Sequence, residues 1–148
     1  MICGGTGIAP MYQALCKLMN TTSDERRVVL LYGNHTPADI LLKDELHTWA
    51  RKQRHRLTIV HCIGTAHARD NARPDGWRDT DEYVAETGWV DEAKVRKYAF
   101  PPSEDTLVFV CGIPALYEGM CGPRSEKALP DGSTLAKLGY TESMVSKM

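Results

Sequence analysis

The chain has 148 residues, of which 43% are hydrophobic and 25% are charged, and this is the composition of one globular domain. The net charge of −1 gives no electrostatic reason to expect a nucleic acid or an anionic membrane surface as a partner. No apolar run approaches the roughly 20 residues that a membrane span needs. The cysteines are odd in number and form no Cys-x-x-Cys pair, which favours a reducing intracellular compartment: Cys3, Cys16, Cys62, Cys111 and Cys121.

The first element is a glycine-rich turn near the start of the chain. Gly4, Gly5 and Gly7 can adopt conformations that a Cβ would hinder, and they let a ligand approach the backbone closely. A helix is predicted over residues 10–18, and the N-terminal amides of a helix attract negative groups such as phosphate. A turn of this kind normally follows a buried strand. Because only residues 1–3 precede it, we expect a truncated first strand in a chain cut from a longer protein.

The next elements alternate between strand and helix. A run of aliphatic residues predicts a buried strand at residues 27–33, and Thr36 or Asp39 is placed to cap the helix predicted over residues 40–53. A second buried strand is predicted at residues 56–63. The apolar residues of the predicted helix have helical spacing and are expected to face the core: Leu41, Leu42, Leu46 and Trp49.

The second half of the chain begins with a polar stretch, residues 64–88, which is predicted to be irregular and to contain a functional or mobile loop at residues 69–76. Regular elements are predicted after it, in this order: a helix at residues 91–98, a buried strand at 105–112, a helix from about Pro114 that Gly122 and Pro123 interrupt, a helical pattern at 133–138 and a short terminal segment.

Alternation of strands and helices predicts an α/β fold, a Rossmann-like parallel sheet with helices on both faces. In such sheets the ligand lies at the carboxyl ends of the strands. Two of the predicted strands end in glycine, at residues 3–5 and at residues 111–112. We therefore expect these two strand ends to converge at one ligand site.

Three ordered motifs resemble the pyridine-nucleotide half of the ferredoxin-reductase superfamily. They are residues 4–11 (GGTGIAPM), residues 31–42, which contain LYGNHT and DILL, and residues 110–114 (VCGIP). The subgroup is similar to NADH-cytochrome b5 reductase and to the flavoprotein module of nitrate reductase. Residues 119–148 are similar to the tail of fungal-type b5 reductases. The resemblance covers nearly the whole chain, so residues 1–148 are identified as one NADH-binding domain.

The resemblance implies roles for individual residues. The glycine turn would hold the nucleotide pyrophosphate with Thr6 near the nicotinamide, Asn34 would contact the adenosine half, and Cys111 would lie near the ring that delivers hydride. Thr6 and Cys111 are therefore the expected catalytic residues, and no metal site is expected. The expected cofactor-binding residues are Gly4, Gly5, Thr6, Gly7, Pro10, Met11, Asn34, Thr36, Asp39, Cys111, Gly112 and Pro114.

The resemblance also implies an activity. NADH would pass hydride to FAD, and single electrons would then leave for a haem acceptor such as cytochrome b5. The FAD-binding domain, with its Arg-x-Tyr-(Ser/Thr) signature, is missing from this chain and is expected upstream, so the isolated chain is expected to be inactive. The parent is expected to be an intracellular enzyme, with anchoring to a mitochondrial or endoplasmic reticulum membrane through a missing N-terminus as an open alternative and with no direct membrane contact from this domain.

Two alternative functions stay open at this point. The chain can be the reductase domain of a nitrate reductase or an oxygenase system, or it can be a non-catalytic nucleotide-binding fragment. The chain also departs from the family pattern: Ile113 and Leu116 stand where the family has proline and methionine, and Met148 stands where the family has an aromatic residue that covers the flavin.

Several candidate residues have a plainer interpretation. A cysteine that ends a buried strand, as Cys111 does, is often only a packing residue. His61, Cys62 and His67 could suggest a metal, but alternation along the strand points His61 and Cys62 to opposite faces. The basic run at residues 51–56 is either a solvated helix end or a docking surface for an acidic electron acceptor.

Overall fold

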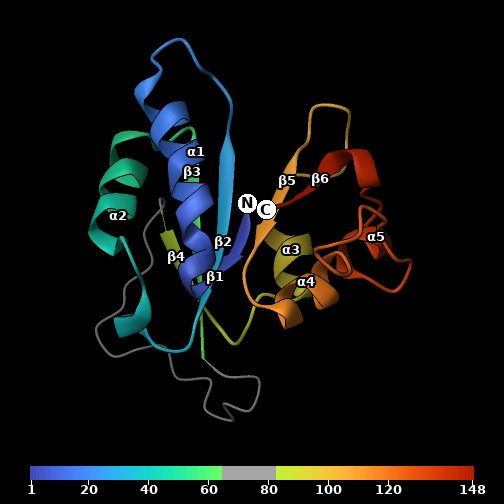
Figure 1. Ribbon diagram of the computed structural model, residues 1–148. Coiled ribbons are helices and arrows are strands. Elements are labelled where there is room, and N and C mark those ends of the chain that lie inside the picture. Colours follow the sequence, from blue (N-terminus) through green and yellow to red (C-terminus); the bar gives the residue numbers. More distant parts are fainter. Residues whose placement is uncertain (65–82) are drawn as a thin grey trace.

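The computed structural model describes residues 1–64 and 83–148, and its centre is a six-stranded sheet with helices on both faces (Figure 1). Every pair of neighbouring strands is parallel. This confirms the predicted α/β class. The strands are β1 (Ile2–Gly4), β2 (Val28–Asn34), β3 (Leu57–Ile63), β4 (Tyr83–Thr87), β5 (Val108–Cys111) and β6 (Val145–Lys147).

The order of the strands shows where the chain reverses the direction in which it adds strands across the sheet. Across the sheet the order is β4-β3-β2-β1-β5-β6, so the chain moves outward from β1 to β4 and then returns past β1 to begin β5. The short strand β1 therefore lies at the centre, between β2 and β5. In open parallel sheets, ligands bind outside the carboxyl ends of the strands at such a reversal point. Here that point lies between β1 and β5.

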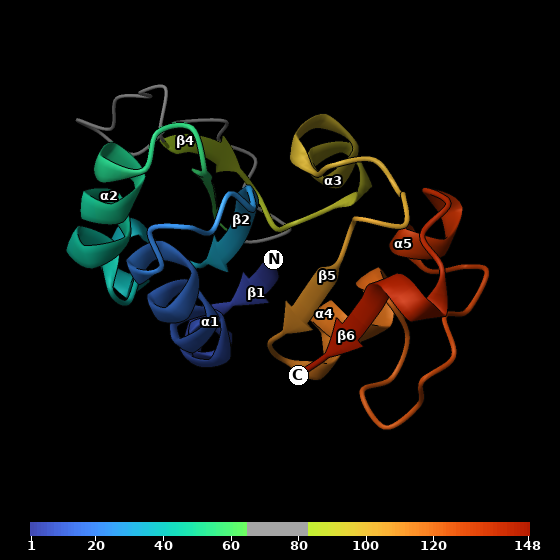
Figure 2. The ribbon, with the colours of Figure 1, turned by 90° about the horizontal axis from the view of Figure 1, so that it is seen from above.

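One face of the sheet is covered by α1 (Ile8–Asn20) and α2 (Lys43–Lys52). The buried residues of α1 recur at spacings of three and four, which places one apolar stripe against the sheet: Ile8, Met11, Leu15 and Met19. Each such side chain contributes on the order of 2 kcal/mol through burial of apolar surface. Figure 2 shows these two helices together on one side of the strands.

The opposite face is covered by α3 (Glu92–Tyr98), α4 (Pro114–Met120) and α5 (Thr134–Lys137). These helices bury Val95, Tyr117 and Leu135 against strand residues such as Val60 and Val110. Helix α3 begins where the sequence predicts, because the Asp91 side chain accepts a hydrogen bond from the Lys94 amide at 2.9 Å and caps the helix. Three 3-10 turns complete the fold: η1 (Gly5–Gly7), η2 (Pro37–Asp39) and η3 (Glu142–Met144).

Two strands lie where the sequence predicted none. Strand β4 lies in the stretch predicted to be irregular, and β6 lies in the terminal segment. Both are edge strands that pair with a single neighbour, and only one residue of β4, Ala85, is buried. Short, polar edge strands lack the apolar pattern by which strands are recognised. The loop predicted at residues 69–76 lies outside the described residues.

Helix α2 starts three residues later than predicted. Leu42, at its N-cap, has a φ of +57°. This left-handed conformation is incompatible with an α-helix, so the helix cannot extend to Leu42 or to the residues before it. Leu41 is 46% exposed, so its predicted place in the apolar face is wrong. Leu46 is fully buried as predicted, whereas Trp49 is only partly buried and stacks on Tyr12 with ring centroids 5.1 Å apart.

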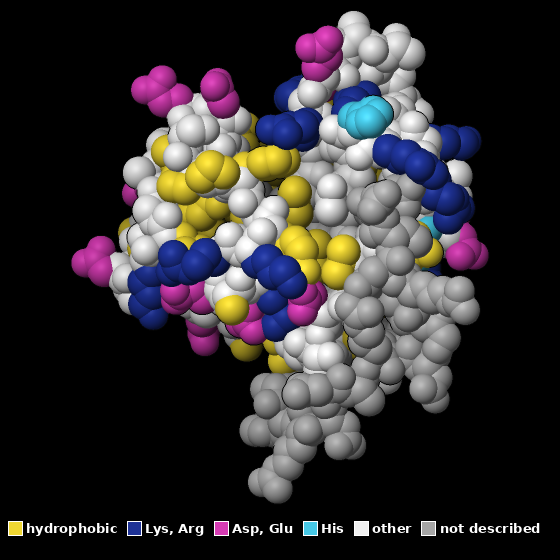
Figure 3. Space-filling view, turned by 180° about the vertical axis from the view of Figure 1, so that it is seen from behind, with side chains coloured by type: hydrophobic (Ala, Val, Ile, Leu, Met, Phe, Trp, Pro, Cys, Tyr) yellow, Lys and Arg dark blue, Asp and Glu magenta, His cyan; other side chains and the backbone are white. Residues whose placement is uncertain are grey.

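The basic run at residues 51–56 is only partly a solvated helix end. Arg56 donates hydrogen bonds to the backbone oxygen atoms of Leu18 at 2.8 Å and Arg26 at 3.4 Å, and its side chain is 15% exposed. It therefore ties the loop before β2 to the loop before β3. Figure 3 shows Lys and Arg side chains on both parts of the back face, and a group of hydrophobic side chains on the part that lies toward α5. No helix of the described residues is long and apolar enough to cross a membrane.

Candidate functional site

The glycine turn joins β1 directly to α1. Gly5 has a φ of +51°, and a Cβ built there would meet no atom within 4 Å, so this residue is glycine because of its backbone conformation. Gly7 is glycine for a different reason. A Cβ built on Gly7 would lie 2.3 Å from the carbonyl oxygen of Cys111, which is too close for any side chain. The turn therefore packs tightly against the end of β5.

The end of β5 meets this turn as the sequence predicts. Cys3 of β1 is in register with Cys111 of β5. A Cβ built on Gly112 would lie 2.6 Å from Cδ2 of Leu116 and 3.3 Å from the amide nitrogen of Gly4. The two glycine-bearing strand ends thus converge, and they do so at the reversal point of the sheet.

The N-terminus of α1 emerges from this turn without a cap of its own. Its N-cap residue is Gly7, which has no side chain to accept a hydrogen bond, and its first turn holds no acidic residue. The first amides of a helix have no intrahelical partners, and the helix dipole makes this end favourable for an anion. Thr6 and Ala9 are exposed at this end of the helix, which leaves room for a phosphate group beside the turn.

Asn34 provides an unusual polar group beside the turn. It ends β2 and is 2% exposed, yet neither polar atom of its side chain makes a hydrogen bond with any described residue, although the amide lies near the Tyr32 hydroxyl. An unsatisfied buried polar group costs about 1–3 kcal/mol. A buried amide of this kind at the carboxyl edge of the sheet is suited to hydrogen-bond a polar ligand.

Thr36 and Asp39 form a closed local motif just beyond β2. The Oδ2 atom of Asp39 accepts hydrogen bonds from the Thr36 amide at 2.9 Å and from the Thr36 hydroxyl at 2.7 Å. This capping box begins the turn η2, whereas the sequence predicted that one of these residues would cap the longer helix. Both residues are exposed, and their turn follows the carboxyl end of β2 just as the glycine turn follows the carboxyl end of the parallel strand β1.

The remaining predicted residues differ in how accessible they are. Thr6 is exposed on the turn, and Pro10 is half-buried in the first turn of α1. Met11 is 1% exposed and belongs to the hydrophobic core, so its side chain supports the helix from below. Cys111 is half-buried, and Pro114 is exposed at the first position of α4.

Comparison with known proteins agrees with this geometry. The sequence profile of a family described as the oxidoreductase NAD-binding domain matches residues 1–122. The chain belongs to this family. The matched residues include the turn formed by η1 and α1, which lies at the reversal point of the sheet.

The relatives of this NAD-binding domain are reductases. It is 35% identical over 150 residues to NADH-cytochrome b5 reductase 2 of Debaryomyces hansenii, covering 99% of this chain and 46% of the relative. It is 35% identical over 127 residues to nitrate reductase [NADH] of Petunia hybrida, covering 86% of this chain and 13% of the relative. The chain therefore spans about half or less of the curated relatives it matches.

A solved structure has the same fold. The cytochrome b5 reductase domain of Ulva prolifera nitrate reductase superimposes with a TM-score of 0.76 at 27% identity, covering 100% of this chain and 47% of that one. The match extends over both edge strands of the sheet, including β6 at residues beyond the family profile.

Two aromatic residues at the carboxyl edge of the sheet, Trp89 and Tyr32, are not among the predicted site residues. Trp89 packs edge-on against His35 with ring centroids 4.9 Å apart, and its ring carbon Cε3 lies 3.5 Å from the position of a Cβ on Gly33. Tyr32 places its hydroxyl between two backbone segments of the site. A signal was present for Tyr32, because a buried tyrosine needs a hydrogen-bond partner for its hydroxyl, but the sequence does not indicate which partner.

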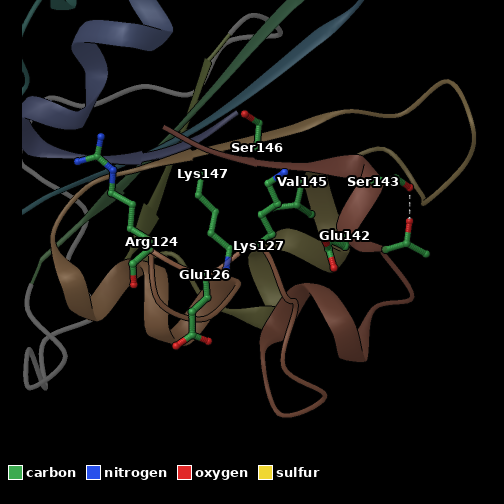
Figure 4. Close-up of a pocket in the computed structure, with 10 residues that line it drawn as sticks. Arg124, Glu126, Lys127, Glu142, Ser143, Val145, Ser146 and Lys147 are labelled. Atoms are coloured by element: carbon green, nitrogen blue, oxygen red, sulfur yellow. Dashed lines mark hydrogen bonds between the residues drawn. The ribbon is translucent and has the colours of Figure 1, made fainter.

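A separate cavity lies away from these residues. It has a volume of about 730 Å³ and lies beside β6, at the edge of the sheet (Figure 4). Lys147 reaches across its floor and donates hydrogen bonds to the backbone oxygens of Pro123 at 3.0 Å and Ala128 at 2.9 Å. None of the residues predicted to bind the nucleotide lines this cavity.

His61 and Cys62 of β3, which could suggest a metal site, do not lie together in the structure. Cys62 packs in the core under α3, α4 and α5, whereas His61 lies on the opposite face, beside His47 of α2. This confirms the prediction that the two side chains point to opposite faces. Over residues 1–64 and 83–148, no group of three or more potential metal ligands is present.

Proposed function

We propose that this NAD-binding domain is the NADH-binding half of a flavoprotein reductase that passes hydride from NADH to FAD and then single electrons to a haem acceptor such as cytochrome b5. One observation carries the proposal: the uncapped N-terminus of α1 and the end of β5 meet at the reversal point of the sheet, with Gly7 packed on Cys111. The FAD would be held by a separate domain of the parent, since the relatives are about twice as long as this chain.

The proposed binding mode follows from the positions of the residues. The amides of the turn, Gly4 to Gly7, would hydrogen-bond the pyrophosphate, and the buried amide of Asn34 would bond a polar group of the adenosine half. Cys111, at the end of β5, would border the nicotinamide. The cofactors supply the redox chemistry, and the residues of this chain orient the ring, where small errors of placement are costly.

The names of the relatives bear on the electron donor and the electron acceptor. The curated relatives are named as NADH-cytochrome b5 reductases and as an NADH-dependent nitrate reductase. These names support NADH as the electron donor and a haem protein such as cytochrome b5 as the acceptor. The five free cysteines support an intracellular location for the parent.

The proposal is tested in the parent protein, which would contain both this chain and its flavin domain. Flavin reduction by NADH is followed by rapid mixing in the wild type, in Cys111→Ser and in a matched control, Cys16→Ser, whose residue is half-buried on α1. We expect Cys111→Ser to slow flavin reduction by about tenfold or more while flavin content stays normal, since ring placement is disturbed. The control should react at the wild-type rate. Wild-type flavin that NADH does not reduce would refute the proposed function.

A further inference from the structure

The hydroxyl of Tyr32 connects two segments that are distant in sequence and adjacent at the NAD-binding edge. It donates a hydrogen bond to the carbonyl oxygen of Gly5 at 3.1 Å and accepts one from the amide of Leu41 at 3.3 Å. The ring is fully buried in the core between β2 and α1. Burial raises the pKa of Tyr32 to about 12, so the hydroxyl keeps its proton at neutral pH and can donate and accept at once.

The bond to Gly5 fixes the orientation of a peptide group in the phosphate turn. The carbonyl of Gly5 and the amide of Thr6 belong to the same planar trans peptide, so they point in opposite directions. The Tyr32 hydroxyl and the amide of Ile8 both hold this carbonyl toward the protein. The amide of Thr6 is thereby directed away from the core, on the side where the N-terminus of α1 is open. Gly5 has a φ of +51° and no side chain, so few other contacts restrain this peptide.

The bond from Leu41 acts on the second segment of the site. Leu41 follows the capping box of Thr36 and Asp39, and it precedes Leu42, whose φ of +57° marks the sharp turn into α2. The side chain of Leu41 is 46% exposed, whereas that of Ile40 is buried in the core and holds the segment from one side. The hydrogen bond to Tyr32 adds a polar link from this segment to the same atom that holds the phosphate turn.

We propose that Tyr32 is a positioning residue that couples the pyrophosphate turn to the Asp39 segment and so presets the two halves of the nucleotide site. This inference rests on the proposed function and adds a residue to it. Tyr32 need not touch the nucleotide, because it acts through the peptide of Gly5 and the amide of Leu41. Without the hydroxyl, the phosphate turn must be ordered when NADH binds, and that ordering lowers the affinity.

The experiment compares Tyr32→Phe with Tyr140→Phe. Tyr140 is a matched control, because it is also buried and also donates a hydrogen bond from its hydroxyl to a backbone oxygen, that of Phe100, but it lies beyond the NAD-binding edge. The dissociation constant for NADH is measured by calorimetry, the stability by thermal unfolding, and the hydrogen exchange of the Ile8 amide, which donates to the Gly5 carbonyl, by NMR. We expect Tyr32→Phe to weaken NADH binding by about three- to tenfold, the effect of one lost hydrogen bond, and to speed exchange at Ile8.

The control separates positioning from a general loss of stability. Tyr140→Phe should lower the unfolding temperature to a similar extent and leave both the NADH affinity and the Ile8 exchange unchanged. Equal NADH affinity in wild type and Tyr32→Phe, or equal weakening in both variants, would overturn this inference while leaving the proposed function intact. A wild-type chain that binds no NADH would overturn the proposed function and this inference with it.

Discussion

Gly7 is the residue of the phosphate turn at which a side chain has the least room. A Cβ there would lie 2.3 Å from a backbone oxygen, that of Cys111, and a backbone atom cannot move aside as a flexible side chain can. We expect Gly7→Ala to push the turn away from β5 and to lower stability by about 1–3 kcal/mol, as overpacking does. NADH affinity should fall by about tenfold or more because the turn and Cys111 separate. Thermal unfolding and calorimetric titration measure the two effects.

Gly119 supplies the control for this variant. It lies in α4, and a Cβ built there meets no atom within 4 Å. Gly119→Ala should leave NADH affinity unchanged and should leave stability unchanged or raise it slightly, because alanine is the better helix former. A Gly7→Ala protein as stable and as tight-binding as Gly119→Ala would show that the contact with Cys111 is not restrictive.

Asp39 is the residue that we expect to set the choice between NADH and NADPH. Its carboxylate lies just beyond β2, where the adenosine ribose is expected, and a carboxylate repels an added 2′-phosphate. We predict a preference for NADH of about tenfold or more, which corresponds to roughly 1.4 kcal/mol per factor of ten. Asp39→Asn removes the charge and retains an oxygen that can accept the bonds from Thr36. It should narrow the preference mainly by improving NADPH binding.

The matched control for Asp39 is Glu45→Gln, which removes an exposed charge from the first turn of α2. Dissociation constants for both nucleotides are measured by calorimetry for the wild type and the two variants. Equal affinities of the wild type for NADH and NADPH, or a ratio that Asp39→Asn leaves unchanged, would remove Asp39 from the site.

At the scale of elements, a buried histidine pair joins α2 to β3. The Nε2 atoms of His47 and His61 are 2.9 Å apart, and the ring of His47 stacks on Tyr83 of β4 with centroids 3.9 Å apart. Burial lowers the pKa of His47 to about 4 and that of His61 to about 3. The nearby charges of Lys43 and Arg51 act in the same direction on His47.

This pair makes the stability of the fold depend on pH in one direction. Each histidine has a pKa of about 6.5 in the unfolded chain and a lower pKa in the folded protein. As the pH falls, the unfolded chain therefore takes up protons before the folded protein does. The free energy of unfolding should therefore reach its full value above pH 6.5. It should fall as the pH drops toward 4, by on the order of 1 kcal/mol per pH unit for each histidine. Urea unfolding at a series of pH values measures the slope.

The variants for this prediction are His47→Gln and His55→Gln. His47→Gln should reduce the slope between pH 6 and 4.5 clearly, because one of the two buried groups no longer titrates. His55 is exposed after the end of α2, so His55→Gln should keep the wild-type slope. A slope that is the same in all three proteins would show that the pair does not govern acid stability.

The sequence predicts the central elements of this fold better than the edge elements. Strands β2 and β3 are continuous apolar runs because helices cover them on both faces, and their predicted limits lie within one residue of the observed ones. Strands β4 and β6 are short and only partly buried, and they are fixed by pairing with β3 and β5, which no local pattern reveals. In the candidate site, the glycines of the turn can be predicted because they form a local sequence motif, whereas the contact of Gly7 with Cys111 and the two hydrogen bonds of Tyr32 depend on tertiary structure.

At the scale of the whole molecule, this chain should carry no flavin when it is purified alone. The flavin-binding signature is not in the sequence, and the NAD-binding family profile accounts for residues 1–122. We predict a colourless protein, and adding FAD should produce no retained absorbance after gel filtration. Stoichiometric flavin in the purified chain would contradict the division of the two cofactors between two domains.

The central claim is that the nucleotide binds at the reversal point between β1 and β5, and NMR mapping of backbone amides during an NADH titration tests it most directly. We predict that the largest shifts fall on Gly4 to Gly7, on Asn34 and on Cys111 and Gly112, which come from three separate strand ends. The cavity of about 730 Å³ beside β6 provides an internal control, and its residues 141–147 should hardly shift. Shifts concentrated around that cavity, or no shifts at saturating NADH, would contradict the account.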